Sequence, residues 1–391
     1  MIPYSKQSIN AADIAAVVTV LKSPLITQGP TVRSFEAELA RYCGTAHAVV
    51  FNSGTSALHA AYFAAGVGTG DEVIVPALTF AATANCALYL GAKPVFADVD
   101  PKVGNMSVAS AKKLITKRTR AIVPVDYGGR PADVAPLRAL ARKHKLVFIV
   151  DAAQSLGATY RGRPVGGQAD MTMFSLHPVK SITSAEGGAI VTDNERYASA
   201  LRLFRSHGIT NDPARMVRKG QGAWYQEMQA LGYNYRMTEL QAALGWSQMK
   251  RLDAFVAKRR KLAQRYHASL ADIPGIILPV PDRALARSAW HLYPIRLSNP
   301  AIRNEVFDRL RAAGIGVQVH HLPVHRHLFY ERRGYKKGSC PHAERFVDAE
   351  ISIPIYPTLS KKDQDTVVKT LRVILASYPA HVLRGHTPRV V

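Results

Sequence analysis

One lysine in this sequence lies where covalent chemistry is possible. Lys180 sits in a loop of small and neutral residues between two apolar runs, within MTMFSLHPVKSITSAEGGAIVTD. A lysine in such a loop can be partly desolvated, which lowers its pKa and leaves the amine free to act as a nucleophile. We therefore interpret Lys180 as a Schiff-base lysine. The alternative is an exposed loop lysine, which is the usual environment of this residue type.

A second group of residues is suited to binding phosphate. The segment Asn52-Ser-Gly-Thr-Ser56 follows one predicted strand and opens a predicted helix. Gly54 permits a tight turn, and the hydroxyl groups of Thr55 and Ser56 would face an anion together with backbone N–H groups. The helix dipole favours negative charge at that end. The alternative is that these residues only cap the helix.

A carboxylate ends another apolar run. Asp151 closes LVFIVD, where its side chain could hold a protonated ring nitrogen, bind Mg²⁺ or cap the next turn. Gln154 follows three residues later and could reach the same ligand. A phosphate cradle, a carboxylate for a ring nitrogen and an imine-forming lysine are together the parts that bind pyridoxal phosphate. The sequence thus indicates one site assembled from three segments.

These segments lie at the ends of apolar runs that alternate with Ala-rich stretches. The runs HAVVFN, EVIVP, PVFADV, RAIVPVD and LVFIVD are typical of strands, and the stretches between them are typical of helices. The alternation predicts an α/β fold with a mostly parallel sheet that is covered on both faces. Ligands of such sheets bind at the carboxyl ends of the strands, where these candidate residues are placed.

The second half of the chain has a different character. A basic stretch at 250–265, KRLDAFVAKRRKLAQR, predicts a long helix. It is followed by the predicted strands HLYPIRL and GVQVH, with a helix near 305–313 between them. We expect a large α/β domain over 1–245 and a smaller α+β domain over 246–391 that includes the long linking helix. The residues at 381–391 are expected to form a frayed tail.

Composition narrows the classes of protein. The 391 residues include 51 Lys and Arg against 28 Asp and Glu, a net charge of +23 that favours phosphate-bearing partners. Three distant cysteines favour a reducing compartment, and the N-terminus lacks the apolar core of a signal peptide, so we expect a cytoplasmic protein. The uncharged stretch at 73–92 contains proline and polar residues. It is typical of a strand, a loop and a helix, so we expect no membrane span.

Five segments carry a resemblance to a known family. They are SGTSAL at 53–58, PALTFAATAN at 76–85, DAAQSLGATYRG at 151–162, FSLHPVKSITSAEGG at 174–188 and GYNYRMTELQAALG at 232–245. On these segments the chain resembles the fold-type I, pyridoxal-phosphate-dependent sugar aminotransferases of the DegT/DnrJ/EryC1/StrS group. The resemblance implies a homodimer with shared active sites, in which Lys180 forms the covalent link to the cofactor.

The resemblance also implies the other contacts of the cofactor. Asp151 would pair with the pyridine nitrogen, and Gln154 would lie near the phenolic oxygen. Phe80 would stack on the ring, and Asn234 would reach the phosphate from the second subunit. The remaining implied phosphate ligands are Thr55, Ser56 and Ser175. From the residues alone, Phe80 is as well explained as a core aromatic and Asn234 as a turn residue.

Within this family the chain is most similar to the transaminases of pseudaminic acid synthesis. The similar segments are SPLITQGP at 23–30, VDYGGRPAD at 125–133, LFRSHGI at 203–209 and GVQVHHLPVH at 316–325. This resemblance implies C4 amination of a UDP-linked 4-keto-6-deoxy-N-acetyl-hexosamine of the L-altrosamine series, with L-glutamate as amino donor. It places Glu186 at the substrate site and His320 at the nucleotide-sugar site of the neighbouring subunit. There are two alternatives to this function. One is another C3 or C4 aminotransferase of UDP-, dTDP- or GDP-sugars, and the other is a non-catalytic regulator that binds the cofactor.

Two further features suggest ligands but lack the rest of a site. Four histidines between 320 and 327 are irregularly spaced around Pro323, and no carboxylate or cysteine completes a standard set, so we expect no metal. The basic helix around Arg259 is accompanied by no nucleic-acid motif and no interleaved aromatic residues. We therefore expect a solvated helix face there, or one that attracts anionic nucleotide sugars, and no nucleic-acid partner.

Overall fold

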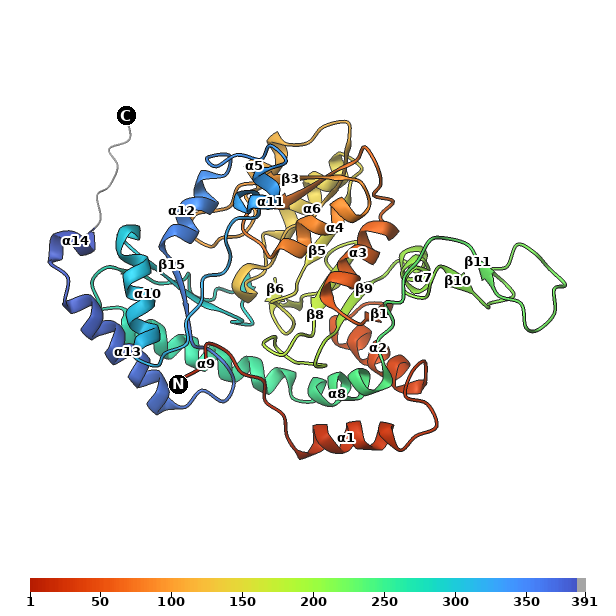
Figure 1. Cartoon of the computed structure of the whole chain (residues 1–391), viewed down its shortest axis with the longest axis horizontal. Helices are drawn as coiled ribbons and strands as arrows, with labels where there is room; N and C mark the ends of the chain where they lie inside the picture. The colour runs from red at the N-terminus through yellow and green to blue at the C-terminus, as the bar shows by residue number, and fades with distance from the viewer. Residues whose placement is uncertain (385–391) are drawn as a thin grey trace.

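The computed structural model describes residues 1–384, so most of the tail expected at 381–391 lies outside the described residues. A seven-stranded sheet and a smaller three-stranded sheet are surrounded by helices (Figure 1). The helices, in chain order, are α1 Ala11–Leu21, α2 Pro30–Cys43, α3 Gly54–Ala64, α4 Ala81–Tyr89, α5 Val108–Lys113, α6 Val134–Lys143, α7 Glu195–Phe204, α8 Glu239–Met249, α9 Leu252–Leu270, α10 Arg303–Ala312, α11 Leu328–Glu331, α12 Pro341–Ala349, α13 Lys361–Ala376 and α14 Ala380–Arg384.

The large sheet confirms the predicted α/β fold. Its strand order is β1-β9-β8-β5-β4-β2-β3, and only β9 runs against the others. The strands are β1 His47–Phe51, β2 Glu72–Pro76, β3 Lys93–Ala97, β4 Thr119–Ile122, β5 Val147–Asp151, β8 Met171–Ser175 and β9 Gly188–Thr192. Each of the five apolar runs interpreted as strands from the sequence forms one of them.

Both faces of this sheet are buried, because successive side chains of each strand point to opposite sides. Phe148 and Val150 of β5 pack into a core with α2, α6 and α9, whereas Ile149 packs into a second core with α3, α4 and α7. This two-sided burial explains why the strands are continuous apolar runs without alternating polar residues.

The register of the sheet brings the candidate segments together. Gly188 at the start of β9 pairs with Phe51 on one side and with Ser175 on the other. Asp151 at the end of β5 pairs with Met173 in β8. The ends of β1, β5 and β8 therefore lie at one edge of the sheet, as the predicted position of the site requires.

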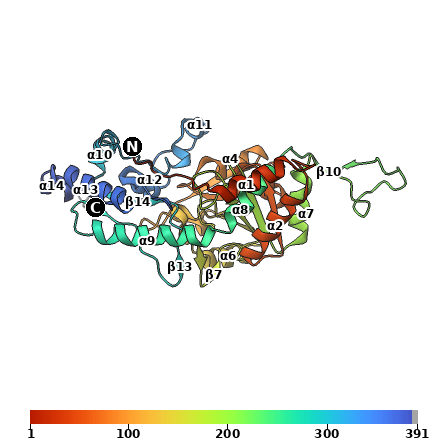
Figure 2. The same ribbon diagram turned by 90° about the horizontal axis from the view of Figure 1, so that it is seen from below.

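The C-terminal part is built on a second sheet. Helices α8 and α9 follow one another along the molecule and lead into it (Figures 1 and 2). Its strand order is β12-β14-β15, with β12 Ile276–Ile277, β14 Tyr293–Leu297 and β15 Glu350–Ile353, and its core includes residues of α9, α10 and α13. The domain limits at 1–245 and 246–391 stay a prediction.

The first residues of the chain also join this second sheet. Ile2 forms a bridge to Ile315, the Gly316 N–H donates to the Ile2 carbonyl at 2.7 Å, and the Ile355 N–H donates to the Tyr4 carbonyl at 3.1 Å. The segment GVQVH at 316–320 was expected to be a strand, and this expectation is wrong. It pairs with β15 only through the bridge between Gln318 and Ser352, because the next backbone N–H on that side, that of His320, donates to the Glu350 side chain and not to a backbone carbonyl.

Short strands complete the described chain. They are β6 Thr159–Tyr160, β7 Arg163–Pro164 and β13 Ala286–Arg287, which form a small sheet, and β10 Ile209–Thr210 and β11 Glu227–Met228, which form an arm. The arm projects far from the rest of the molecule (Figure 1). No helix within residues 1–384 combines the length and the apolar character that a membrane crossing requires.

The linking helix α9 forms as expected, but one of its side chains lies in a different environment from the one predicted. Arg259 was expected on a solvated face, but its side chain is fully buried. Its guanidinium donates to the carbonyl oxygens of Ile355 at 2.8 Å, Trp290 at 3.2 Å, His291 at 3.3 Å and Val179 at 3.4 Å. Burial lowers the pKa of Arg259 to about 10. This one side chain therefore joins α9 to the second sheet and to the residue that precedes Lys180.

We expect Arg259→Leu to lower the free energy of unfolding by about 3 kcal/mol, because it leaves several buried carbonyl groups without donors. Urea unfolding followed by circular dichroism measures this change. The matched control is Lys258→Leu, which removes the neighbouring exposed cation from the same helix. Equal effects of the two substitutions would contradict the linking role of Arg259.

Candidate active site

Lys180 faces a cavity of about 430 Å³ at the carboxyl ends of the large sheet. The loop that carries it connects β8 to β9, and Lys180 is partly accessible through the cavity but otherwise surrounded by protein. Burial lowers the pKa of Lys180 to about 8, and the charge of Asp151 partly opposes this effect. The amine is therefore much closer to its neutral, nucleophilic form at neutral pH than an ordinary lysine.

Asp151 is held in the same cavity by two hydrogen bonds from separate segments. Its Oδ2 accepts a hydrogen bond from the Thr83 hydroxyl at 2.7 Å, and its Oδ1 accepts one from the Ala153 N–H at 3.1 Å. Thr83 is in turn 2.8 Å from the Thr79 hydroxyl. Burial raises the pKa of Asp151, whereas these hydrogen bonds and the charge of Lys180 lower it. The carboxylate is thus fixed in orientation and buried next to a cation.

The start of α3 forms one wall of the cavity. Ser53 caps the helix by accepting from the Ser56 N–H at 3.1 Å. A side chain at Gly54 would put its Cβ 3.2 Å from the Cβ of Ser175, so glycine allows the helix to approach the end of β8 closely. The Thr55 side chain makes no hydrogen bond within residues 1–384 and lines the cavity with Ser175.

Ser56 is placed differently from the other predicted phosphate ligands. Its hydroxyl donates to the Asn52 side chain at 2.7 Å and to the Ser53 carbonyl at 2.8 Å, and Ser56 does not line the cavity. In this structure the Ser56 hydroxyl therefore helps to cap α3, as the alternative interpretation expected, and does not face the cavity. Its backbone N–H is also used by the cap.

Gln154 and Phe80 both line the cavity. The Gln154 Oε1 accepts from the Gly128 N–H at 2.7 Å, which leaves the amide NH₂ for a ligand. Phe80 directly precedes α4, and 61% of its surface is exposed to solvent. Phenylalanine side chains are more often buried. Its ring lies 5.7 Å from the ring of His321, edge to face. An exposed aromatic ring at a cavity provides a surface on which a flat ligand can stack.

His320 is fixed in the cavity by a buried carboxylate. Its Nδ1 is 2.9 Å from the Ser352 hydroxyl, which donates to Glu350 at 2.5 Å, and the His320 N–H also donates to Glu350 at 2.8 Å. Tyr127 donates to the His320 carbonyl at 2.6 Å. Burial lowers the pKa of His320 to about 4, so its imidazole is neutral at pH 7. Its ring orientation is set from the second sheet.

Sequence reasoning missed several residues of this cavity. His291, His321 and Tyr4 line it, although none was among the predicted site residues. Nδ1 of His291 and Nε2 of His321 are buried and have no partner in the described chain. The one sequence signal is the cluster of histidines at 320–327, of which the resemblance assigns only His320 to the site.

The two remaining predicted residues lie at the edge of the cavity or outside it. Glu186 is exposed and lines the mouth, where its carboxylate is 3.9 Å from His177. Asn234 is exposed and does not line this cavity. Its described contacts are made by its backbone, which accepts from the Asn52 amide at 3.4 Å and bridges to Ser206. Its side chain is therefore directed to no partner within residues 1–384.

The histidine cluster itself is divided between two environments. His325 is buried and pairs with Glu344 at 2.8 Å, away from the cavity that His320 and His321 line. Across residues 1–384, no three histidine, cysteine or acidic side chains are grouped as metal ligands would be.

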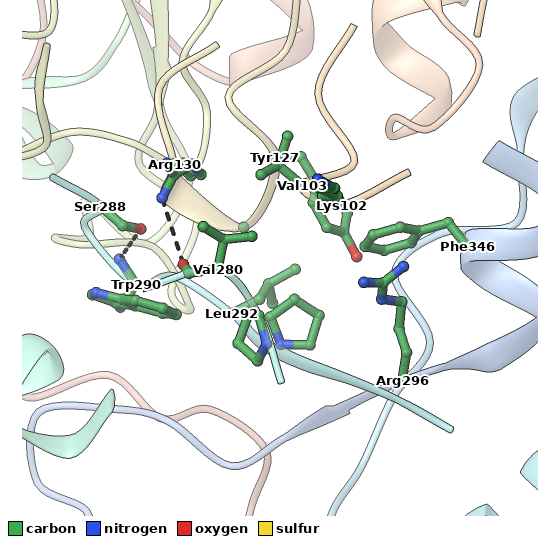
Figure 3. Close-up of a pocket in the computed structure, with 13 residues that line it drawn as sticks. Lys102, Val103, Tyr127, Arg130, Val280, Ser288, Trp290, Leu292, Arg296 and Phe346 are labelled. Atoms are coloured by element: carbon green, nitrogen blue, oxygen red, sulfur yellow. Dashed lines mark hydrogen bonds between the residues drawn. The ribbon is translucent and has the colours of Figure 1, made fainter. Parts of the chain in front are cut away.

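A second, much smaller hollow lies between the large sheet and the C-terminal part (Figure 3). Its volume is about 30 Å³, which is room for a water molecule but not for a substrate. Arg130 donates to the carbonyls of Val280 and Pro281, and the Arg296 guanidinium lies 4.8 Å from the centre of the Phe346 ring. This hollow belongs to the packing between the two parts of the molecule.

The chain is similar to known proteins along nearly its whole length. A model of the DegT/DnrJ/EryC1/StrS aminotransferase family matches residues 7–372. The spore coat polysaccharide biosynthesis protein SpsC of Bacillus subtilis is 39% identical over 380 residues, which cover 96% of this chain and 97% of SpsC.

Solved structures agree with this match. PseC of Helicobacter pylori, an aminotransferase involved in the biosynthesis of pseudoaminic acid, has a TM-score of 0.89 at 33% identity and covers 96% of this chain and 100% of its own. The putative sugar aminotransferase Spr1654 of Streptococcus pneumoniae, solved in its PLP-form, has a TM-score of 0.90 at 30% identity. The match covers 96% of this chain and 98% of that one.

The lowered pKa of Lys180 predicts its reactivity. In ligand-free protein, acylation of Lys180 should rise with pH to half its maximum near pH 8, because the buried amine loses its proton there and not near its ordinary value of 10.5. Peptide mass spectrometry after brief labelling at a series of pH values measures this midpoint. In urea the midpoint should return toward 10.5, and a midpoint that is the same with and without urea would contradict the burial effect.

Proposed function

The chain belongs to the DegT/DnrJ/EryC1/StrS aminotransferase family, and from that premise we propose the reaction, the substrate and the assembly of this sugar aminotransferase. The proposed reaction moves the amino group of L-glutamate to C4 of a UDP-linked 4-keto-6-deoxy-N-acetyl-hexosamine of the L-altrosamine series, for pseudaminic acid biosynthesis. The observation that carries it is the placement of Lys180 and Asp151 in one buried cavity beside the start of α3.

The cofactor of this family is pyridoxal phosphate, and the residues of the cavity fit it. The amine and the carboxylate are two of the groups that it requires. The third is a cradle for phosphate, formed by the start of α3, the free hydroxyl of Thr55 and Ser175, and a Cβ at Gly54 would narrow it. Bound here, the cofactor supplies a carbonyl carbon that carries amino groups between substrates and a ring that accepts electrons.

The side chains of this cavity would divide the work between them. Lys180 would hold the cofactor covalently and, once released, its neutral amine would move a proton at the substrate's reacting carbon. Asp151 would keep a proton on the pyridine nitrogen, because its buried negative charge stabilises the positive ring. Thr83 and Ala153 fix the orientation of that carboxylate. Phe80 would stack on the ring, and Gln154 would approach its phenolic oxygen.

The choice of substrate is supported by PseC, whose name links it to pseudaminic acid biosynthesis and whose structure matches over nearly the whole chain. A second candidate is another C3 or C4 aminotransferase of nucleotide sugars. It is favoured by the identity to SpsC, a protein of spore coat polysaccharide biosynthesis, which at 39% exceeds the 33% identity to PseC. Glu186 at the mouth of the cavity and His320 within it are the proposed sugar-nucleotide contacts.

Three features support a homodimer with shared sites. Phe80 is exposed at the cavity with nothing over it, and Asn234 directs its side chain to no described partner. The projecting arm also exposes large apolar residues, including Trp224 at 79% and Val217 at 81% (Figure 1). Exposed apolar residues on a projecting element are typical of a surface that another chain covers. A second copy would supply Asn234 to the phosphate of its partner's cofactor.

The substrate is tested directly by a panel of keto sugars. Enzyme loaded with the amino form of the cofactor is mixed with UDP-, dTDP- and GDP-linked 3-keto and 4-keto sugars, and products are identified by mass and NMR. The proposal expects amination at C4 of the UDP-linked N-acetyl-hexosamine. Preferred amination of a different sugar would establish the second candidate. Failure to form the amino form with glutamate would instead favour a non-catalytic relative.

Shared sites predict that two inactive variants restore each other. Lys180→Ala removes the covalent link, and Asn234→Asp places a negative charge against the partner's phosphate. A mixed dimer would hold both lesions in one site and leave the other intact, so up to a quarter of wild-type activity should return after subunit exchange. Exchange is verified with differently tagged chains. If tagged mixed dimers form but stay inactive, Asn234 does not act across the interface.

A further inference from the structure

A groove lined by five cations lies away from the Lys180 cavity. It has a volume of about 850 Å³ and is bordered by one side of α6 and by the hairpin of β6 and β7. Figure 2 shows α6 and β7 on the same side of the molecule, next to β13. The cationic residues that line the groove are Arg138, Arg142, Lys143, Arg161 and Arg163.

These cations have no acidic partners in the described chain. Within residues 1–384, none of the five forms an ion pair within 4.0 Å, whereas cations elsewhere do so, such as Arg118 with Glu72 at 2.7 Å. Arg138 is half-buried, and its Nε is buried without any hydrogen-bond partner. A buried guanidinium N–H normally finds an acceptor, so an acceptor from outside the chain would satisfy it.

The carboxylates nearest in sequence are engaged by other groups. The Tyr160 hydroxyl donates to Asp133 at 2.9 Å, and the Phe148 N–H donates to Asp170 at 2.9 Å. Tyr160 also accepts from the Ala135 N–H at 3.2 Å, so it joins the hairpin to the start of α6. The Arg161 guanidinium lies 5.5 Å from the centre of the Tyr160 ring. The groove thus has a fixed floor and cationic walls.

The spacing of the lining residues along α6 explains why they form one wall of the groove. Ala135 precedes Arg138 and Ala139 by three and four residues, and these precede Arg142 by four and three, so all four lie along one side of α6. The two alanines leave space between the helix and the hairpin, and the arginines border that space. Arginine is the side chain best suited to phosphate, because its planar donors match two phosphate oxygens at once.

We propose that this groove binds a small anion carrying two or more linked phosphates, such as pyrophosphate or the diphosphate of a nucleotide. Several cations around a concave site match a compact ligand with several negative charges. A membrane surface is disfavoured, because no large apolar side chain is exposed among the lining residues. Single-stranded nucleic acid is disfavoured, because Tyr160 is the one aromatic residue of the groove and is largely buried.

This site is separate from the one that carries the proposed function. The groove and the Lys180 cavity share no lining residue. Five residues, 155–159, connect Gln154 in the cavity to Tyr160 in the groove. The proposal does not depend on which sugar the enzyme aminates.

The test is calorimetric titration of the holoenzyme with inorganic pyrophosphate, orthophosphate and UDP in 0.15 M salt. Two double variants remove cations from different elements: Arg138→Gln with Arg142→Gln on α6, and Arg161→Gln with Arg163→Gln on the hairpin. Each pair should weaken pyrophosphate binding about tenfold or more, since hydrogen bonds to charged groups are lost. The control, Arg311→Gln, removes an exposed cation from α10 and should change the affinity less than twofold.

The arms of the titration distinguish the sources of the phosphate. UDP binding that weakens in parallel assigns the groove to nucleotides, whereas pyrophosphate binding without it assigns the groove to the free anion. Circular dichroism checks that each double variant is folded. If one of the two double variants does not fold, the other is sufficient for the test. Pyrophosphate affinity that is unchanged in both pairs would overturn the proposal. Binding of duplex DNA through these arginines, without pyrophosphate binding, would also overturn it.

Discussion

The buried guanidinium of Arg259 is the contact on which the arrangement of the two parts depends. It bonds to carbonyls on both sides of the cavity: Val179 beside Lys180, and Trp290, His291 and Ile355 in the C-terminal part. A buried charge without a carboxylate is costly, so it persists only where many dipoles are oriented toward it. The loop of Lys180 and the wall that carries His291 are thus held by one side chain, and a shift of α9 would disturb both.

The electrostatics of the cavity follow from the same burial. His291, His320 and His321 all have lowered pKa values because they are buried near one another and near Lys180. Neutral imidazoles leave Lys180 and Asp151 as the principal opposite charges within it. Asp151 and Lys180 are both buried, so their charges interact more strongly than those of an exposed pair would. The imidazoles can also accept or donate hydrogen bonds to a substrate without adding charge.

The strands β1 to β5 could be predicted from the sequence, because strands that are buried on both faces consist of continuous runs of apolar residues. Lys180, Asp151 and Thr55 could be placed for the same reason, since Asp151 ends such a run, Thr55 and Lys180 lie within five residues after one, and the carboxyl ends of the strands meet. Arg259 could not, because its acceptors are backbone carbonyls between 31 and 96 residues away, which leave no pattern in the sequence. His291 and Tyr4 were missed because only tertiary packing brings them to the cavity. The GVQVH segment was misassigned because a side-chain acceptor, Glu350, takes the His320 N–H that a strand would use for pairing, and this long-range contact leaves no pattern in the sequence.

The position of the first residues has a consequence for how this protein folds. Ile2 and Tyr4 complete their hydrogen bonds with Gly314, Gly316 and Ile355, more than three hundred residues later. These are among the most non-local contacts that the chain can make, and closing so long a loop is entropically costly until the intervening structure has formed. On the ribosome, Ile2 and Tyr4 must therefore wait until the residues up to Ile355 have been made. The wall of the cavity that Tyr4 provides would be among the last parts of the native structure to be completed.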